Sequence, residues 1–286
     1  MSSQEPLYQA ILARRSVRRY EKKPLDEAIL EQVQRIVFEA QPLIPDNRYW
    51  TEIRSVASDE DLAKALGGFG RIVTSPHYIV PSLTGKHALE DLGYRLEQVA
   101  VRLAGLGVGS CFIGALGREA RVRARFALPT ERRIGALLIF GSPSMASGDR
   151  AVNAVMRAAA GASNKMPVNR IFFQDTFANP AMPPAELALL LEAARNAPSA
   201  RNAQPWRFLW RDGRLYLFVT RHNLKYPIRP YEEYCFYDGG ICMGNITLAM
   251  EALGMEGHWE MYEGTEPGLP PHPTNLQPLA RLVITK

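Results

Sequence analysis

The sequence predicts an α+β protein whose two halves are diverged copies of each other. Segments with the 3.6-residue period of amphipathic helices are interspersed with short apolar segments typical of strands. The later part of the chain also repeats the earlier part at a nearly constant spacing, the mark of an internal duplication. A third observation is Asp212-Gly213 between two apolar segments, a strong signal for an antiparallel hairpin.

The duplication is visible as two ungapped shifts of the sequence against itself. A shift of 147 residues aligns two long helices, each followed by a Leu-Gly turn and a strand, and a shift of 156 aligns the segments before them. Aligned pairs include Asp91 with Asp238, Gly93 with Gly240, Phe112 with Trp259, Pro42 with Pro198, Trp50 with Trp206 and Arg14 with Arg170. We therefore divide the chain into residues 1–147 and 148–286 and expect one pseudo-twofold unit, packed as a homodimer would be.

In the first half, apolar periodicity and turn residues place the elements. The helix at 25–40 has apolar residues in helical spacing and Asp26 and Glu27 in its first turn, where acidic side chains are favoured. The other expected helices are 4–13, 59–66 and 89–106, and the expected strands are 51–57, 77–81 and 134–140.

In the second half, residues 144–169 are rich in small side chains and are expected to bridge the halves, with an Ala-rich helix at 150–160. Pro183-Pro184 begins a helix at 185–196, because proline is tolerated in a first turn. Strands at 207–211 and 214–220, a helix at 239–253 and a strand at 279–285 complete the expected order.

Composition excludes several classes of protein. With 47% hydrophobic and 22% charged residues the chain is typical of a soluble globular protein. Its apolar runs, such as 134–140, are far shorter than the ~20 residues of a membrane span, and the N-terminus has no apolar signal core, so we expect a cytoplasmic protein without membrane contact. Three cysteines without metal-ligand spacing argue against disulfides and a metal site.

A net charge of +5 is only mildly basic, and much of the excess is arginine. The arginines between 118 and 133 are not interleaved with aromatic residues, so we expect a solvated helix face and no nucleic-acid partner.

Two polar motifs divide unequally between the halves. The first half keeps Arg14-Arg15-Ser16-Val17-Arg18, where the second has the nearly uncharged segment 170–174. The second half keeps Ala197-Pro198-Ser199 through Gln204-Pro205-Trp206, where the first has Leu43, Asp46 and Arg48 in place of Ser199, Asn202 and Gln204. If a site takes one motif from each half, this pattern leaves one complete composite site and one degenerate site.

Each motif also has a structural interpretation when taken alone. Arginines at a helix end suit the helix dipole in a solvated last turn. An Asn-x-Gln-Pro-Trp segment is a plausible turn with a packed tryptophan, and Gly105-x-Gly107-x-Gly109 follows a helix, which excludes a dinucleotide-binding loop.

Together these segments resemble the nitroreductase family, flavoenzymes that are usually homodimers with FMN at the subunit interface. Residues 11–20 are similar to the opening motif of that family, and residues 197–206 to the motif that reaches FMN from the other subunit. Leu106-Gly107 through Ile113-Gly114 resembles the segment whose backbone lies against the flavin, and Lys165-Met166-Pro167 resembles a basic-x-Pro motif at the phosphate. The resemblance implies mostly antiparallel central sheets flanked by helices and a monomer acting as a pseudo-dimer.

The resemblance also implies residue roles. Arg14 and Lys165 would hold the FMN phosphate by charge-assisted hydrogen bonds, with Ser16 as a further donor. Arg18 would stabilise negative charge at the N1/O2 edge of the reduced ring. The implied cofactor-binding set is Arg14, Arg15, Ser16, Arg18, Ile113, Gly114, Lys165, Pro198, Ser199, Asn202 and Gln204, and no catalytic residue is assigned.

The implied function is an FMN-dependent oxidoreductase. NADH or NADPH would reduce FMN, and a small-molecule electron acceptor such as a nitroaromatic, a quinone or an activated alkene would then be reduced by a ping-pong mechanism. Two alternatives stay open at the level of sequence: a flavin-binding or flavin-sensing pseudoenzyme without nicotinamide-driven turnover, and a related enzyme that dehalogenates its substrate or destroys the flavin.

Overall fold

The computed structural model describes residues 5–55, 75–159, 164–226, 231–263 and 268–285. Its helices are α1 (Glu5–Ala13), α2 (Glu27–Glu39), α5 (Ala88–Gly105), α6 (Glu119–Phe126), α7 (Ser147–Ala159), α8 (Ala185–Asn196) and α9 (Tyr234–Leu253). Its strands are β1 (Arg48–Ser55), β2 (His77–Thr84), β3 (Gly109–Gly114), β4 (Ala136–Gly141), β5 (Phe172–Gln174), β6 (Trp206–Arg211), β7 (Arg214–Thr220), β8 (Gly257–Met261) and β9 (Leu276–Ile284). The helix expected at 59–66 lies outside the described residues.

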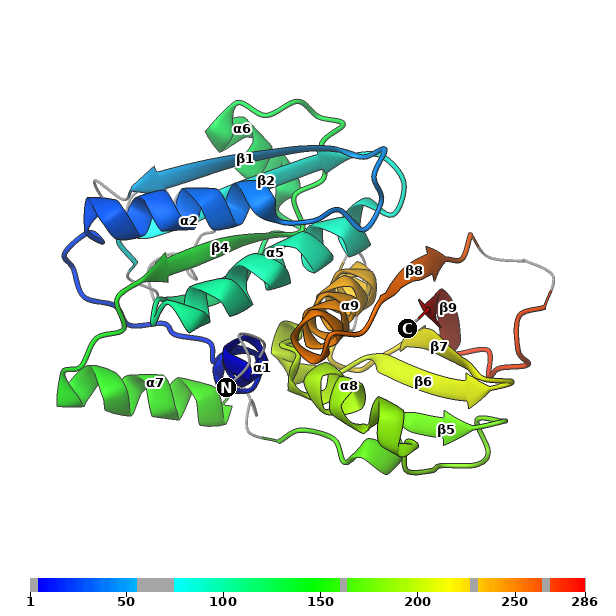
Figure 1. The fold of residues 1–286 in the computed structure, drawn as a ribbon. Coiled ribbons are helices and arrows are strands. Elements are labelled where there is room, and N and C mark those ends of the chain that lie inside the picture. The colour runs from blue at the N-terminus through cyan, green and yellow to red at the C-terminus, as the bar shows by residue number, and fades with distance from the viewer. Residues whose placement is uncertain (1–4, 56–74, 160–163, 227–230, 264–267, 286) are drawn as a thin grey trace.

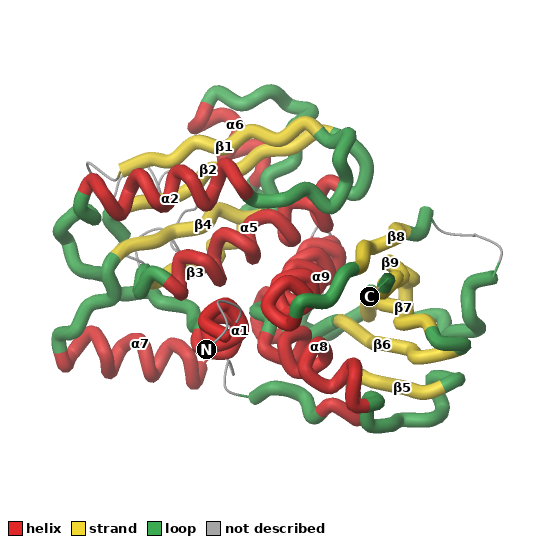
Figure 2. The backbone as a smooth tube through the Cα atoms, in the orientation of Figure 1, coloured by secondary structure: helices red, strands yellow, loops and turns green. Residues whose placement is uncertain are grey.

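The strands form two separate sheets, on opposite sides of helices α5 and α9 (Figures 1 and 2). The first has the order β1-β2-β4-β3 and is antiparallel throughout. The second has the order β5-β6-β7-β9-β8, in which β5 alone pairs in parallel. Without β5, the second sheet repeats the strand order of the first. The predicted α+β class with mostly antiparallel sheets is confirmed, and the division at residue 147 stays a prediction.

Helices α5 and α9 cross in close contact at glycines that the sequence repeat pairs with each other. A Cβ atom added at Gly93 would collide with the carbonyl oxygen of Tyr237, and one added at Gly240 would collide with that of Glu90. Glu90 and Tyr237 are themselves 147 residues apart. The crossing is therefore reciprocal, as at an interface with twofold symmetry, and only glycine permits this approach of the two backbones.

The arginines between 118 and 133 differ from expectation. Helix α6 ends at Phe126, so the predicted solvated helix face is wrong for the later arginines. Arg132 instead stacks on the half-exposed Trp50, with 3.7 Å from its guanidinium carbon to the ring centroid, and Arg133 pairs with Glu119. Both side chains hold neighbouring segments together.

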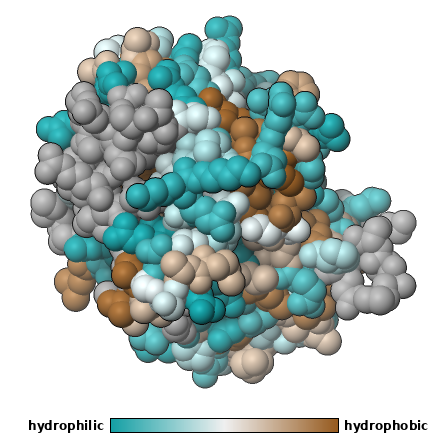
Figure 3. Space-filling view, turned by 90° about the vertical axis from the view of Figure 1, so that its left-hand side faces the viewer, coloured by the Kyte–Doolittle hydropathy of each residue, from teal (hydrophilic) through white to brown (hydrophobic). Residues whose placement is uncertain are grey.

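One face of the molecule, shown in Figure 3, has hydrophobic residues interrupted by hydrophilic ones. Phe38 of α2 and Val155 of α7 are among the large apolar side chains that are exposed. Within the described parts of the chain, no helix is long and apolar enough to cross a membrane.

Candidate functional site

The arginine motif continues directly from α1 and lies along the beginning of β3. Ser16 forms a parallel bridge with Ser110, and the amide of Val17 donates a 2.9 Å hydrogen bond to the carbonyl of Ser110. Ile113 and Gly114, the predicted ring-facing residues, form the other end of the same strand. The first motif thus contacts one end of β3, and the predicted ring-facing residues form the other end.

The second motif is a tight loop after α8. Its Ala200 amide donates to both carboxylate oxygens of Asp238 in α9, at 3.1 and 3.0 Å, and its Gln204 amide donates to Ser199 Oγ at 2.9 Å. Arg201, Asn202 and Gln204 all have positive φ, at 53°, 51° and 48°. Non-glycine residues adopt this region rarely, and such strain concentrates at functional sites.

The loop forms hydrogen bonds to the backbone on both sides of Lys165. The side chain of Gln204 accepts from the amide of Met166 at 2.8 Å and donates to the carbonyl of Asn164 at 3.0 Å. The Asn202 side chain donates to the same carbonyl at 3.1 Å. Asn202 and Gln204 are both buried. These two predicted ligand contacts therefore also position the backbone on either side of Lys165.

The two motifs meet at Lys165. Its Nζ donates to the carbonyl of Ala197 at 2.6 Å and to that of Asn196 at 3.3 Å, just before Pro198, which is half-buried. Burial lowers the pKa of Lys165 to about 8, and the positive charge of Arg14 contributes to this lowering. The structure therefore brings Arg14 and Lys165, the two predicted phosphate ligands, into one electrostatic environment.

A carboxylate that the sequence reasoning missed completes this cluster. Glu97, in the middle of α5, is fully buried, and its Oε1 lies 3.3 Å from Nε of the buried Arg14. Burial raises the pKa of Glu97 to about 7 because desolvation outweighs the attraction of Arg14 and Lys165. The sequence carries no signal that sets Glu97 apart, because α5 also contains Glu90, Asp91, Arg95 and Arg102.

The remaining arginines of the motif differ in exposure. Arg15 is exposed and its guanidinium donates to the carbonyls of Leu12 and Arg14, which places it as a cap on the end of α1. The amide of Arg18 donates to the side chain of Asn153 in α7 at 3.0 Å. Among the described residues, Nη1 of Arg18 is buried without a hydrogen-bond partner.

The predicted ring-facing end of β3 is covered by a tyrosine from the second half. A Cβ at Gly114 would collide with the hydroxyl of Tyr234, which accepts a hydrogen bond from the amide of Leu116 at 3.2 Å. Burial raises the pKa of Tyr234 further above its ordinary value, so the hydroxyl keeps its proton at neutral pH. Tyr231 stacks beside it, with ring centroids 6.4 Å apart.

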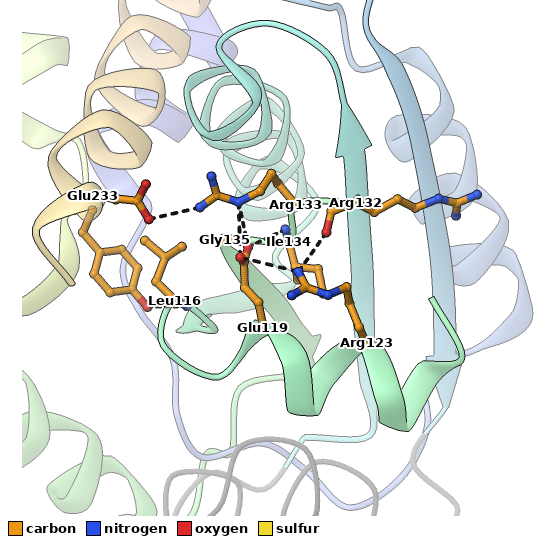
Figure 4. A network of polar contacts seen from close by, with 9 residues as sticks. Leu116, Glu119, Arg123, Arg132, Arg133, Ile134, Gly135 and Glu233 are labelled. Atoms are coloured by element: carbon orange, nitrogen blue, oxygen red, sulfur yellow. Dashed lines mark hydrogen bonds and ion pairs between the residues drawn. The ribbon is translucent and has the colours of Figure 1, made fainter. Parts of the chain in front are cut away.

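A polar network holds residues 231–234, which carry these two tyrosines, against the first half (Figure 4). Arg133 donates to Glu119 and, at 3.2 Å, to Glu233 next to Tyr234. Glu119 also accepts from the amides of Ile134 and Gly135, at 2.8 and 3.1 Å. The network joins α6 and the turn before β4 to the beginning of α9. It helps to fix the position of Tyr234 against Gly114 of β3.

The chain is similar to several known proteins. The profile of the family described as "Putative TM nitroreductase" matches residues 6–226. A Thermotoga maritima structure described as "a putative nitroreductase" is 17% identical over 97% of this chain and 93% of that chain, with a TM-score of 0.58. No protein with a curated description matches the sequence.

Two further solved structures match about half of the chain. An FMN-dependent nitroreductase from Clostridium difficile is 16% identical, covering 48% of this chain and 88% of its own, with a TM-score of 0.41. A "putative nitroreductase in complex with fmn" from Desulfovibrio desulfuricans is 21% identical, covering 49% of this chain and 87% of its own, with a TM-score of 0.42.

The fold and the converging motifs define a nitroreductase-like protein with two sheets in one chain. Because the family profile spans well over half of the sequence, the chain belongs to this nitroreductase family.

Proposed function

We propose that the protein is an FMN-dependent oxidoreductase of nitroreductase type, with one composite FMN site per chain. NADH or NADPH is the electron donor, and a nitroaromatic, quinone or similar small molecule is the acceptor, in a ping-pong sequence of two half-reactions. The bound FMN supplies the hydride chemistry, while the protein supplies placement and electrostatics. The physiological unit is a monomer whose two halves take the place of two subunits.

The observation that carries this proposal is the meeting of both motifs at Lys165. The Arg14 segment comes from the first half, and the 197–204 loop comes from the second. The two are linked through Lys165, which donates a hydrogen bond to the carbonyl of Ala197 and whose pKa is lowered by the positive charge of Arg14. The opposite pairing, between the segment at 170–174 and the loop at 41–50, keeps Arg170 at the position of Arg14 but lacks the equivalents of the other polar residues of the two motifs. One site is therefore expected to bind.

The residues present fit a phosphate group. Within the described residues, Nε and Nη1 of Arg14 are buried without a hydrogen-bond partner, as is Nη1 of Arg18. Buried donors on cationic side chains are costly when unpaired, and a phosphate dianion with its strong acceptor oxygens would satisfy those of Arg14. Arg14 and Lys165 would hold the phosphate, and Ser16 would add a hydroxyl donor.

Other residues would orient the ring. Arg18 would place positive charge at the edge where negative charge develops on reduction. The backbone of Ile113 and Gly114 would face the ring from β3, and Ser199 and Asn202 would contact polar atoms from the second half. The hydroxyl of Tyr234, fixed beside Gly114, would exclude water from that side.

The test is reconstitution of the full chain with FMN, followed by anaerobic titration with NADH and with NADPH. We expect about one FMN per chain and loss of the oxidised flavin absorbance with at least one nicotinamide. A yellow protein that stays oxidised with both would contradict the oxidoreductase and favour a flavin-binding protein without turnover. Two equivalent FMN per chain would contradict the single composite site.

A matched pair of variants tests the assignment of the site. Arg14→Ala combined with Asn202→Ala is expected to abolish stable FMN binding. Arg170→Ala changes the position that the repeat pairs with Arg14, and FMN binding should survive it. Full retention of FMN by the double variant would overturn the placement.

A further inference from the structure

The charged cluster behind the proposed phosphate position contains one acid whose role the proposed function does not explain. Glu97 is fully buried in α5, and neither carboxylate oxygen has a hydrogen-bond partner among the described residues. Its ion pair with Arg14 at 3.3 Å is the closest charged contact that the structure gives it. An ionised carboxylate buried without hydrogen bonds is costly, so its presence calls for a reason.

The groups facing Glu97 come from three other elements. Arg14 approaches from α1 and Lys165 from the segment before β5, and both attract the carboxylate. From α9, Tyr237 and Cys242 lie close enough to interact electrostatically with Glu97. Burial raises the pKa of both, so they stay neutral. Asp238, also of α9, is a second buried acid, and its charge interacts with that of Lys165. In the free protein Glu97 balances part of the charge of Arg14 and Lys165.

A phosphate arriving at Arg14 and Lys165 changes this balance. It carries about −1.5 to −2 charges at neutral pH. Two anions would then compete for the same two cations, next to the fully buried Glu97. Like charges in such a site favour protonation of one of them. Tyr237 and Cys242 are already protonated. Asp238 accepts hydrogen bonds from the amide of Ala200 and the hydroxyl of Tyr226, which stabilise its ionised form. Glu97 has no such hydrogen bonds and a pKa of about 7, so it is the acid that takes up the proton.

We propose that Glu97 is an internal counter-anion of the cofactor phosphate position: it balances Arg14 and Lys165 in the free protein, and it takes up one proton from solvent when the phosphate binds. The proposal rests on the FMN site proposed above. Its consequence is that FMN affinity falls as pH rises above neutrality, because Glu97 must then be protonated against a growing cost. Replacing the carboxylate by an uncharged amide removes that cost.

The experiment is calorimetric titration of the full-length apo-protein with FMN at about pH 8, in buffers with different ionisation enthalpies, for wild type and Glu97→Gln. For a group with a pKa of about 7, linkage predicts that proton uptake by wild type exceeds proton uptake by Glu97→Gln by more than about half a proton. Glu97→Gln should bind FMN about tenfold more tightly than wild type at pH 8, with the difference vanishing near pH 6. Lys165 can also take up a proton at this pH, and its pKa depends on the charge of Glu97, so the same comparison in a Lys165→Arg background isolates the uptake by Glu97.

Two controls separate the possible explanations. Glu90→Gln removes another buried acid of α5 and should bind FMN as wild type does. Riboflavin, which has no phosphate, should show no Glu97-dependent proton uptake. Wild-type binding without proton uptake would overturn the proposal without any substitution, and so would a Glu97→Gln protein that binds FMN equally or more weakly. If wild type binds neither FMN nor riboflavin, the proposed function itself fails.

Discussion

Asp91 and Asp238 occupy equivalent positions in the two halves. Each accepts a hydrogen bond from a backbone amide of a loop, but their surroundings differ. Asp91 accepts from the amide of Leu43 in the loop after α2, as Asp238 accepts from Ala200 in the loop after α8. One turn later the halves differ. Arg95 pairs with Asp91 at 2.9 Å, whereas the residue 147 positions further on is Cys242.

The difference shows what each half has kept. Asp91 has a local cation, and Asn47 of its own loop donates to it at 2.9 Å, so its polar groups are satisfied within the first half. Asp238 has a cysteine in place of that arginine, and burial raises its pKa to about 7. Cys242 lies close enough to Lys165 to interact with it and stays neutral, because burial raises the pKa of its thiol. In the first half, the partners of Asp91 all come from that half. In the second half, Asp238 lies next to the candidate site.

The largest expected effect comes from removing the two anchors in turn. Asp91→Ala leaves the buried Arg95 uncompensated and should cost about 3–5 kcal/mol of unfolding free energy. Asp238→Ala leaves an amide and the hydroxyl of Tyr226 unpaired and should cost about 1–3 kcal/mol. Urea unfolding with FMN titration checks both. Only Asp238→Ala should weaken FMN binding, and equal loss of affinity in both would break the comparison.

The second effect concerns the crossing of α5 and α9. Gly93→Ala and Gly240→Ala each put a methyl group into the backbone of the other helix, and each should destabilise the protein by about 1–3 kcal/mol. Similar losses for the two would support the reciprocal crossing. Gly105→Ala is the control, because its Cβ would find only Ala10 at 3.7 Å. Thermal unfolding measures all three, and a loss confined to one of the first two would argue against reciprocity.

The smallest effect concerns two ion pairs between the halves, Lys86 with Glu263 and Arg133 with Glu233. Positions 86 and 233 are equivalent in the sequence repeat. Arg133 is partly buried and bridges Glu119 and Glu233, so Arg133→Ala should cost about 1 kcal/mol. Lys86 pairs with Glu263 at the exposed surface, and Lys86→Ala should leave the melting temperature unchanged. An equal drop in melting temperature for the two variants would show that exposure does not set the difference.

Much of the fold could be predicted because the signals are local. Helix α8 begins and ends where periodicity and the preceding prolines place it, and the Asp212-Gly213 turn joins β6 and β7 as expected. Strand β5 has three residues and exists because it pairs with β6, which no local pattern shows. Helix α9 begins at Tyr234, before the expected residue 239, because its aromatic first turn packs on the first half.

The site was predictable in composition but not in connectivity. Both motifs and Lys165 were identified from their residues, and the structure brings them together, while their contacts with FMN stay a prediction. That Asn202 and Gln204 bind the backbone beside Lys165 depends on where residues 164–166 run. Glu97 looked like an ordinary helical glutamate because its burial against Arg14 arises only when α1 packs on α5.

The repeated strand order has a consequence for how this protein changes over generations. In a symmetric homodimer every substitution appears at two places, so an alteration that improves one location must be tolerated at its twin. Here the loop at 41–50 and the loop at 197–206 are encoded separately. Selection can therefore act on each in isolation, and a mutagenesis library can vary the loop at 41–50 while the loop at 197–206 and the arginine motif keep their sequence.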